Sequence, residues 1–200
     1  MSKLTLDFYQ REDVLNISRE LLGKVLCTNF HGKLTSGIIV ETEAYAGITD
    51  KASHAYNSRR TERTETMYEL GGSAYIYLCY GIHHLLNIVT NKKNIPHAVL
   101  IRALEPQDGI KFMLQRRNKK KKDQSLTVGP GSLTRALGIT VKDSGTLLID
   151  NLIWLEDQNI QIKNQDILAS PRVGVQYAGQ DANNPWRFRI KGNSWTSPVP

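Results

Sequence analysis

Residues 37–45 read GIIVETEAY, an apolar run that ends in two carboxylates and a tyrosine. In an extended chain, side chains two residues apart point to the same side, so Glu41, Glu43 and Tyr45 share one face. Two like charges on one face repel each other and are costly to bury. The stretch therefore predicts a strand whose acids are either solvated at the strand end or used in a site.

The pattern of apolar and turn residues around this stretch predicts one mixed α/β domain over residues 1–200. Besides a hairpin that turns near Tyr80 and Gly81, we expect strands at 24–30, 33–45, 97–106, 153–157, 172–179 and 187–192. We expect helices along the apolar stripe from Val14 to Leu22, ended by Gly23, at 106–118 with a proline near its start, and at 129–139 with Ser132 as N-cap. The polar residues 46–72 are expected to form an ordered loop with short helical pieces.

Composition narrows the classes of partner. The net charge of +7 makes polyanions the leading class of ligand. No apolar run approaches the roughly 20 residues of a membrane helix, so no membrane association is expected. The N-terminus lacks the order of a secretion signal, and the two cysteines, Cys27 and Cys79, are typical of a reduced, cytoplasmic protein.

Aromatic residues gather around the acids. Six of the eight tyrosines lie between Tyr45 and Tyr80. Tyr75 and Tyr77 share a strand face, where packing into the core explains Tyr75 equally well. Tyr80 lies at the expected hairpin tip, where a ring could act as a wedge between stacked bases. Basic charge, stacking rings and a strand-end acid together are the parts needed by an enzyme that acts on one extruded base.

Seven ordered blocks carry a family resemblance: LLGKVL, IVETEAY, YIYLCYG, LLNIV, VLIRALEP, GPGSL and RVGVQYAG. Their order and spacing resemble those of the alkyladenine (3-methyladenine) DNA glycosylase family from about Phe8 to Trp195. The resemblance implies a single domain with a curved antiparallel sheet, flanked by helices, and a protruding β-hairpin. It also implies excision of 3-methyladenine and 7-methylguanine, with hypoxanthine as a further candidate, in base excision repair.

Residue by residue, the resemblance implies the following roles. Glu43 matches the general base for the attacking water, and Arg102 matches the arginine that helps to hold this water; Glu41 is left a supporting role. The flipped base is expected to contact Tyr45, Tyr77, His54 and Asn87. Tyr80 matches the side chain inserted into the minor groove, and Ile82 beside it is also expected to contact DNA. Arg59 and Arg63 are expected to bind phosphates because they lie near His54 in the sequence, not because of the resemblance.

The resemblance also sets expectations for partners. It implies a monomer that acts on damaged double-stranded DNA without metal or cofactor and without strand cleavage, at the nucleoid of a bacterium or in the nucleus of a eukaryote. The chain departs from the family at Thr61-Glu62-Arg63-Thr64, where T-P-R-N is usual, and at Tyr68, where phenylalanine is usual. These changes leave the loop conformation and the range of substrates open.

Other readings remain open at this point. A non-catalytic binder of distorted DNA needs only the basic charge and the tyrosine wedge. A hydrolase of free sugars or nucleosides fits ETEAY but not the charge. Adjacent His83 and His84 point to opposite strand faces, which disfavours a metal site. The basic run at 116–122 is typical of a solvated loop that adds salt-sensitive, nonspecific affinity.

Overall fold

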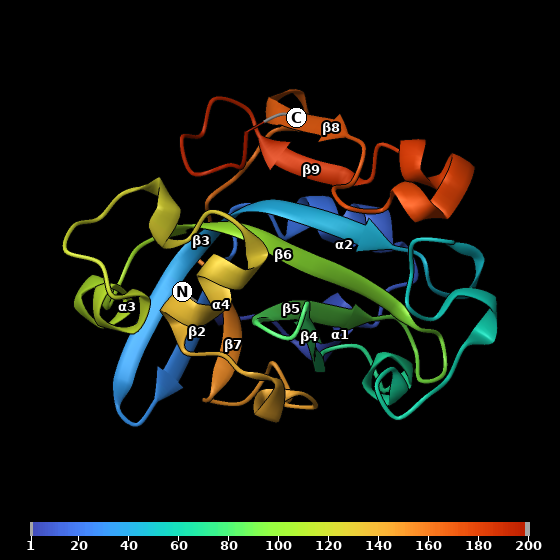
Figure 1. Ribbon diagram of the computed structural model, residues 1–200, viewed down its shortest axis with the longest axis horizontal. Coiled ribbons are helices and arrows are strands. Elements are labelled where there is room, and N and C mark those ends of the chain that lie inside the picture. The colour runs from blue at the N-terminus through green and yellow to red at the C-terminus, as the bar shows by residue number, and fades with distance from the viewer. Residues whose placement is uncertain (1, 199–200) are drawn as a thin grey trace.

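The long strand β3 (Lys33–Tyr45) is the centre of the sheet in the computed structural model, which describes residues 2–198 (Figure 1). One edge of β3 pairs with β6 (His97–Pro106). The other edge pairs first with β2 (Val25–Phe30) and then, over residues 41–43, with β9 (Arg187–Ile190). Register shifts around residue 41 mark an irregularity where β9 replaces β2. The two acids of β3 are therefore enclosed by strands on both sides.

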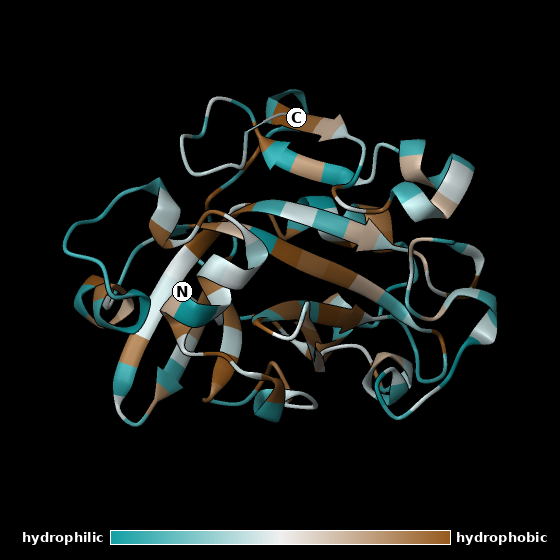
Figure 2. Cartoon of the chain, viewed as in Figure 1, coloured by the Kyte–Doolittle hydropathy of each residue, from teal (hydrophilic) through white to brown (hydrophobic). Residues whose placement is uncertain are grey.

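The described strands pair antiparallel throughout, in the order β1-β7-β2-β3-β6-β5-β4, with β8 joined to β9 beside this path. The remaining strands are β1 (Ser2–Lys3), β4 (Ala74–Cys79), β5 (His83–Thr90), β7 (Ile153–Asp157) and β8 (Ile167–Ser170). Apolar residues concentrate along β6 and its neighbours, and polar residues along the outer loops (Figure 2). The expected mixed α+β fold with a curved antiparallel sheet and a protruding hairpin is confirmed.

Helices flank this sheet. The α-helices are α1 (Leu6–Tyr9), α2 (Val14–Glu20), α3 (Ile110–Arg117) and α4 (Pro130–Leu137). Short 3-10 helices are η1 (Gly47–Thr49), η2 (Tyr56–Ser58), η3 (Glu65–Tyr68), η4 (Gln124–Leu126), η5 (Val141–Asp143), η6 (Asn164–Asp166) and η7 (Gln176–Asn183). Within residues 2–198, no helix is long and apolar enough to cross a bilayer.

Helix α4 links the outer layer to the hairpin. Its Thr134 hydroxyl donates to the backbone carbonyl of His84 at 2.6 Å. A Cβ atom added at Gly131 would lie 2.9 Å from the His83 ring, so only glycine lets the start of α4 approach the hairpin this closely. The hairpin turns as expected: Tyr80 and Gly81 both have positive φ, and the Ile82 N–H donates to the Cys79 carbonyl at 3.2 Å.

Four expectations about helices and strands are wrong. The helix expected at 106–118 begins only at Ile110, after Gly109 at φ 67°, because Pro106 is still the last residue of β6. The N-cap of α4 is Gly129 and not Ser132, because Pro130 occupies the first turn, where a missing N–H is tolerated. Residues 172–179 form no strand; bends lead there into η7. Helix α2 ends at Glu20 with Leu21 as its C-cap, and Gly23, at φ 86°, lies in the turn that follows instead of ending the helix. The other expected strands are confirmed.

Candidate active site

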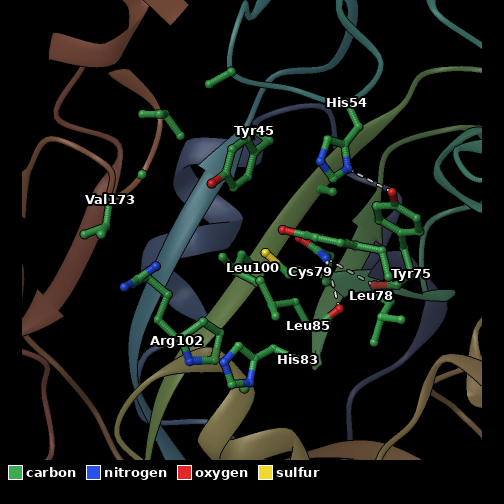
Figure 3. A pocket seen from close by; sticks show the side chains of 18 of the residues that line it. Tyr45, His54, Tyr75, Leu78, Cys79, His83, Leu85, Leu100, Arg102 and Val173 are labelled. Carbon is green, nitrogen blue, oxygen red and sulfur yellow. Dashed lines mark hydrogen bonds between the residues drawn. The ribbon is translucent and has the colours of Figure 1, made fainter. Parts of the chain in front are cut away.

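A cavity of about 660 Å³ opens beside the C-terminal half of β3 (Figure 3). Its walls come from β3, β4, β5 and β6, from the segment 52–67, from the start of α4, and from residues 173–177. Arg102, Val173 and Tyr45 lie along one wall, and His54 and Tyr75 lie across from them. The cavity thus brings together segments that are far apart in the sequence.

The Glu43 carboxylate lies directly behind this wall and is fully buried. Its Oε2 accepts from the Tyr45 hydroxyl at 2.8 Å, and its Oε1 accepts from the Val173 N–H at 2.8 Å. Arg102 Nη1 lies 3.3 Å from the same Oε1. A carboxylate has roughly four acceptor positions, so these three close donors, taken among residues 2–198, leave one position open, on the Oε2 atom. All three donor residues line the cavity, whereas Glu43 itself does not.

Aromatic rings cover the opposite side of the cavity. The rings of His54 and Tyr77 meet edge to face at 4.6 Å between centroids, and those of Tyr75 and Tyr77 lie 5.6 Å apart. A hydrogen bond of 2.9 Å joins His54 Nδ1 and the Tyr75 hydroxyl. Burial, followed by the charges of Arg63 and Arg59, lowers the pKa of His54 to about 4, so this imidazole is neutral at pH 7.

A family model described as methylpurine-DNA glycosylase matches residues 7–194. The chain belongs to this family. The protein is therefore a DNA glycosylase, a hydrolase of N-glycosyl bonds, and its substrate is DNA. Membership favours an enzyme over the non-catalytic binder of distorted DNA and over the hydrolase of free nucleosides.

Curated bacterial relatives cover nearly the whole chain, each named "Putative 3-methyladenine DNA glycosylase". A Chlamydia pneumoniae protein is 47% identical over 184 residues, which are 92% of this chain and 92% of that protein. A Bacillus cereus (strain G9842) protein is 45% identical over 199 residues, 95% and 96% of the two chains. A Clostridium perfringens (strain 13) protein is 41% identical over 203 residues, 98% of each.

The other expected site residues of the glycosylase lie in the cavity wall or on the hairpin tip, except Arg59, which lies on the surface outside the cavity. Asn87 is buried in the wall, where its Nδ2 donates to the Tyr75 carbonyl at 3.2 Å. Tyr80 and Ile82 project from the hairpin tip, with 90% and 71% of their surface exposed. Arg63 lines the cavity and lies over the Tyr77 ring at 5.2 Å, whereas Arg59 is exposed and does not line the cavity.

The altered loop of this glycosylase makes hydrogen bonds of its own. The Tyr68 hydroxyl donates to the Arg59 carbonyl at 3.0 Å, a bond that phenylalanine could not make. The Thr61 N–H donates to Thr64 Oγ1 at 2.8 Å. The residues that replace the usual proline and asparagine therefore lie in a closed turn, which places Arg63 against the cavity.

Sequence reasoning missed the pair of Arg172 and Asp50. The two guanidinium nitrogens Nη1 and Nη2 donate to the two Asp50 oxygens at 2.5 and 2.8 Å, and both side chains are fully buried. The guanidinium also lies 4.8 Å from the Tyr45 ring centroid. The arginine of RVGV stands in one of the family blocks, but its partner Asp50 lies 122 residues away in the sequence, so the pair could not be predicted from a local pattern.

Two further features of the glycosylase sequence are the adjacent histidines, His83 and His84, and the basic run at 116–122. His84 Nδ1 accepts from the Val141 N–H at 3.0 Å, while His83 faces the cavity. Within residues 2–198 no three His, Cys, Asp or Glu side chains form a group that could hold a metal ion. In the basic run, Lys119 pairs with Asp123 at 3.4 Å and Lys122 lies over the Trp195 ring at 5.4 Å.

Proposed function

We propose that this glycosylase excises alkylated purines, 3-methyladenine and 7-methylguanine above all and hypoxanthine in addition, from duplex DNA during base excision repair. It acts as a monomer and does not cut the strand. The observation that carries the proposal is the Glu43 carboxylate, which lies behind an aromatic cavity with one acceptor position open.

In the proposed reaction, a water molecule donates a hydrogen bond to the open position of Glu43 Oε2 and attacks C1′ of the extruded nucleotide. The C1′–oxygen bond forms while the bond from C1′ to the base nitrogen breaks, and the electron pair of that bond neutralises the cationic alkylated base. The proton of the water passes to Glu43. Arg102 helps to hold the water and the carboxylate.

Nucleotide extrusion is proposed to use the hairpin tip and the aromatic walls. Tyr80 and Ile82 enter the gap that the nucleotide leaves, and unstacking the base costs a few kcal/mol. Stacking on Tyr45 and Tyr77 offsets this cost by roughly 1–3 kcal/mol per base. Asn87 crowds the exocyclic amine of normal guanine, and Arg59 is left as a phosphate ligand on the surface.

A single hydrogen bond of 2.9 Å joins His54 Nδ1 and the Tyr75 hydroxyl, and its direction depends on which ring nitrogen carries the proton. We propose that the hydroxyl donates to Nδ1. The second ring nitrogen, Nε2, then carries the proton and points away from Tyr75 (Figure 3). His54 is thereby proposed to present a donor to an acceptor atom on the base edge.

We expect nitrogen-15 NMR of the imidazole to show the neutral Nε2–H tautomer at pH 7 and a midpoint of titration near 4, because burial opposes the charged form. In Tyr75→Phe, the bond to Nδ1 is lost and a mixture of tautomers is expected. His31, an exposed turn histidine, is the internal control in the same spectra. A dominant Nδ1–H tautomer in the unaltered protein would contradict this assignment.

Tyr80→Ala is expected to slow excision from duplex DNA by at least about tenfold, because stacking is worth roughly 1–3 kcal/mol per base. Excision from the same lesion in single-stranded DNA should change little, since no gap has to be filled there. Tyr80→Phe keeps the ring and is expected to retain the duplex rate. Equal losses on both substrates would show that Tyr80 is not a wedge.

The direct test of the proposed function is a lesion panel. Duplexes that carry 7-methylguanine, hypoxanthine or no lesion, and DNA methylated at adenine N3, are incubated with the protein and then treated with alkali to cut abasic sites. Release of alkylated purines is expected, with no strand cut before the alkali step. No release from any substrate would overturn the proposal.

A further inference from the structure

A second carboxylate lies beside the proposed base and is held differently. Glu41 Oε1 accepts from Arg102 Nε at 2.9 Å and from Arg187 Nε at 2.8 Å. Its Oε2 accepts from the N–H and the hydroxyl of Ser197 at 2.7 and 2.6 Å. Four donors fill the roughly four acceptor positions of a carboxylate. Unlike Glu43, Glu41 therefore has no position left for a water molecule.

The charges around Glu41 keep it ionised. Burial alone would raise its pKa, but the hydrogen bonds of Ser197 and the charges of Arg102 and Arg187 lower the pKa below its usual value. Arg189 also lies nearby on β9, and Glu43 shares Arg102 with Glu41. The Glu41 side chain is fully buried, so it is a fixed negative charge within the protein.

Arg102 connects this fixed charge to the cavity. Its Nε bond to Glu41 sets the plane and direction of the guanidinium, and Nη1 of the same group then faces Glu43 at 3.3 Å. The side chain is 10% exposed and lines the cavity. A chain of contacts thus runs from Ser197, near the C-terminus, through Glu41 and Arg102 to the proposed base.

We propose that Glu41 and Ser197 are positioning residues for the reaction: they orient Arg102, which in turn holds Glu43 and its water. This inference rests on the proposed function of Glu43. A displacement of about 1 Å at a group that aligns the reactants can cost on the order of 100-fold in rate. The tail of the chain is thereby part of the catalytic apparatus, although it does not line the cavity.

The test compares single-turnover excision rates and affinities for abasic duplex DNA. Ser197→Ala removes one donor to Glu41, and Ser197→Pro removes both. Stepwise losses of about 3-fold and at least about 30-fold in excision rate are expected, with affinity for abasic DNA within about 3-fold. Ser194→Ala is the matched control, because Ser194 is an exposed serine of the same tail.

A double-mutant cycle separates positioning from general support of the fold. Glu41→Gln is expected to slow excision about 100-fold alone, and to have little further effect once Arg102→Ala is present. Equal losses in both backgrounds would overturn the inference, as would Ser197→Pro behaving like Ser194→Ala. If Glu41→Gln does not fold, the serine series decides.

The two proposals fail in distinguishable ways. Normal excision by the Ser197 and Glu41 variants, alongside loss of excision in Glu43→Gln, would refute the positioning role and leave the proposed function intact. Failure of the unaltered protein to release any base would refute both.

Discussion

Glu43→Gln is expected to slow base excision by at least about 10²–10⁴-fold, the usual contribution of general base catalysis. Glutamine has nearly the same shape, but its amide cannot take a proton from water. Single-turnover rates on 7-methylguanine duplexes measure the loss. Because the cavity walls are unchanged, affinity for abasic duplex DNA should stay close to that of the unaltered protein.

Glu12→Gln is the control for this substitution. Glu12 is exposed, and its ion pair with Lys92 is long, at 3.5 Å. We expect it to excise at the normal rate. If Glu43→Gln retains the full excision rate, Glu43 is not the general base. If its affinity for abasic DNA falls together with the rate, the substitution disturbs the cavity itself.

Among the substitutions proposed for this protein, Asp50→Asn is expected to lower the free energy of unfolding the most. Its partner Arg172 is fully buried, so the substitution leaves a buried charge without its counter-ion. Breaking a buried ion pair in this way typically costs about 3–5 kcal/mol in the free energy of unfolding. Urea unfolding measures the loss. Excision should fall as well, because Arg172 lies over the Tyr45 ring and bonds the Ala44 carbonyl at 2.9 Å.

The comparison for stability is Glu65→Gln. Glu65 pairs with Arg60 at 2.5 Å, but the two side chains are 49% and 43% exposed. Water and salt screen such a pair, so its loss should leave the urea midpoint nearly unchanged. If Asp50→Asn and Glu65→Gln unfold at the same urea concentration, the buried pair of Asp50 and Arg172 does not stabilise the fold as expected.

Local patterns allowed most of the fold to be predicted from the sequence. The alternation along β3 and the paired runs around Tyr80 each depend on neighbours in the chain, and both are confirmed. The helix expected to end at Gly23 ends at Glu20, and Gly23 lies in the following turn. Ser132 was wrong as a cap because Pro130 already sets the first turn. The strand predicted at 172–179 is wrong because this segment is held by contacts with Asp50 and Glu43, which are distant in sequence.

The candidate site was predictable only as far as the family blocks reach. The blocks name Glu43, Arg102 and the tyrosines, and the structure brings these residues to one cavity or directly behind it. The open acceptor position of Glu43 and the tail contact of Glu41 depend on distances between separate segments. Ser197 lies 156 residues from Glu41, outside every block, so no local pattern could indicate that contact.

The left-handed turn at Tyr80 has a consequence for the search along a genome. Because φ is +50° at Tyr80 and +72° at Gly81, the backbone of the tip is already bent in the free protein. Its conformational entropy is lost once, when the chain folds, and not again at each encounter with an intact base pair. In the proposed extrusion by Tyr80, sampling a helix would then require deformation of the DNA alone, and base pairs weakened by damage would yield first.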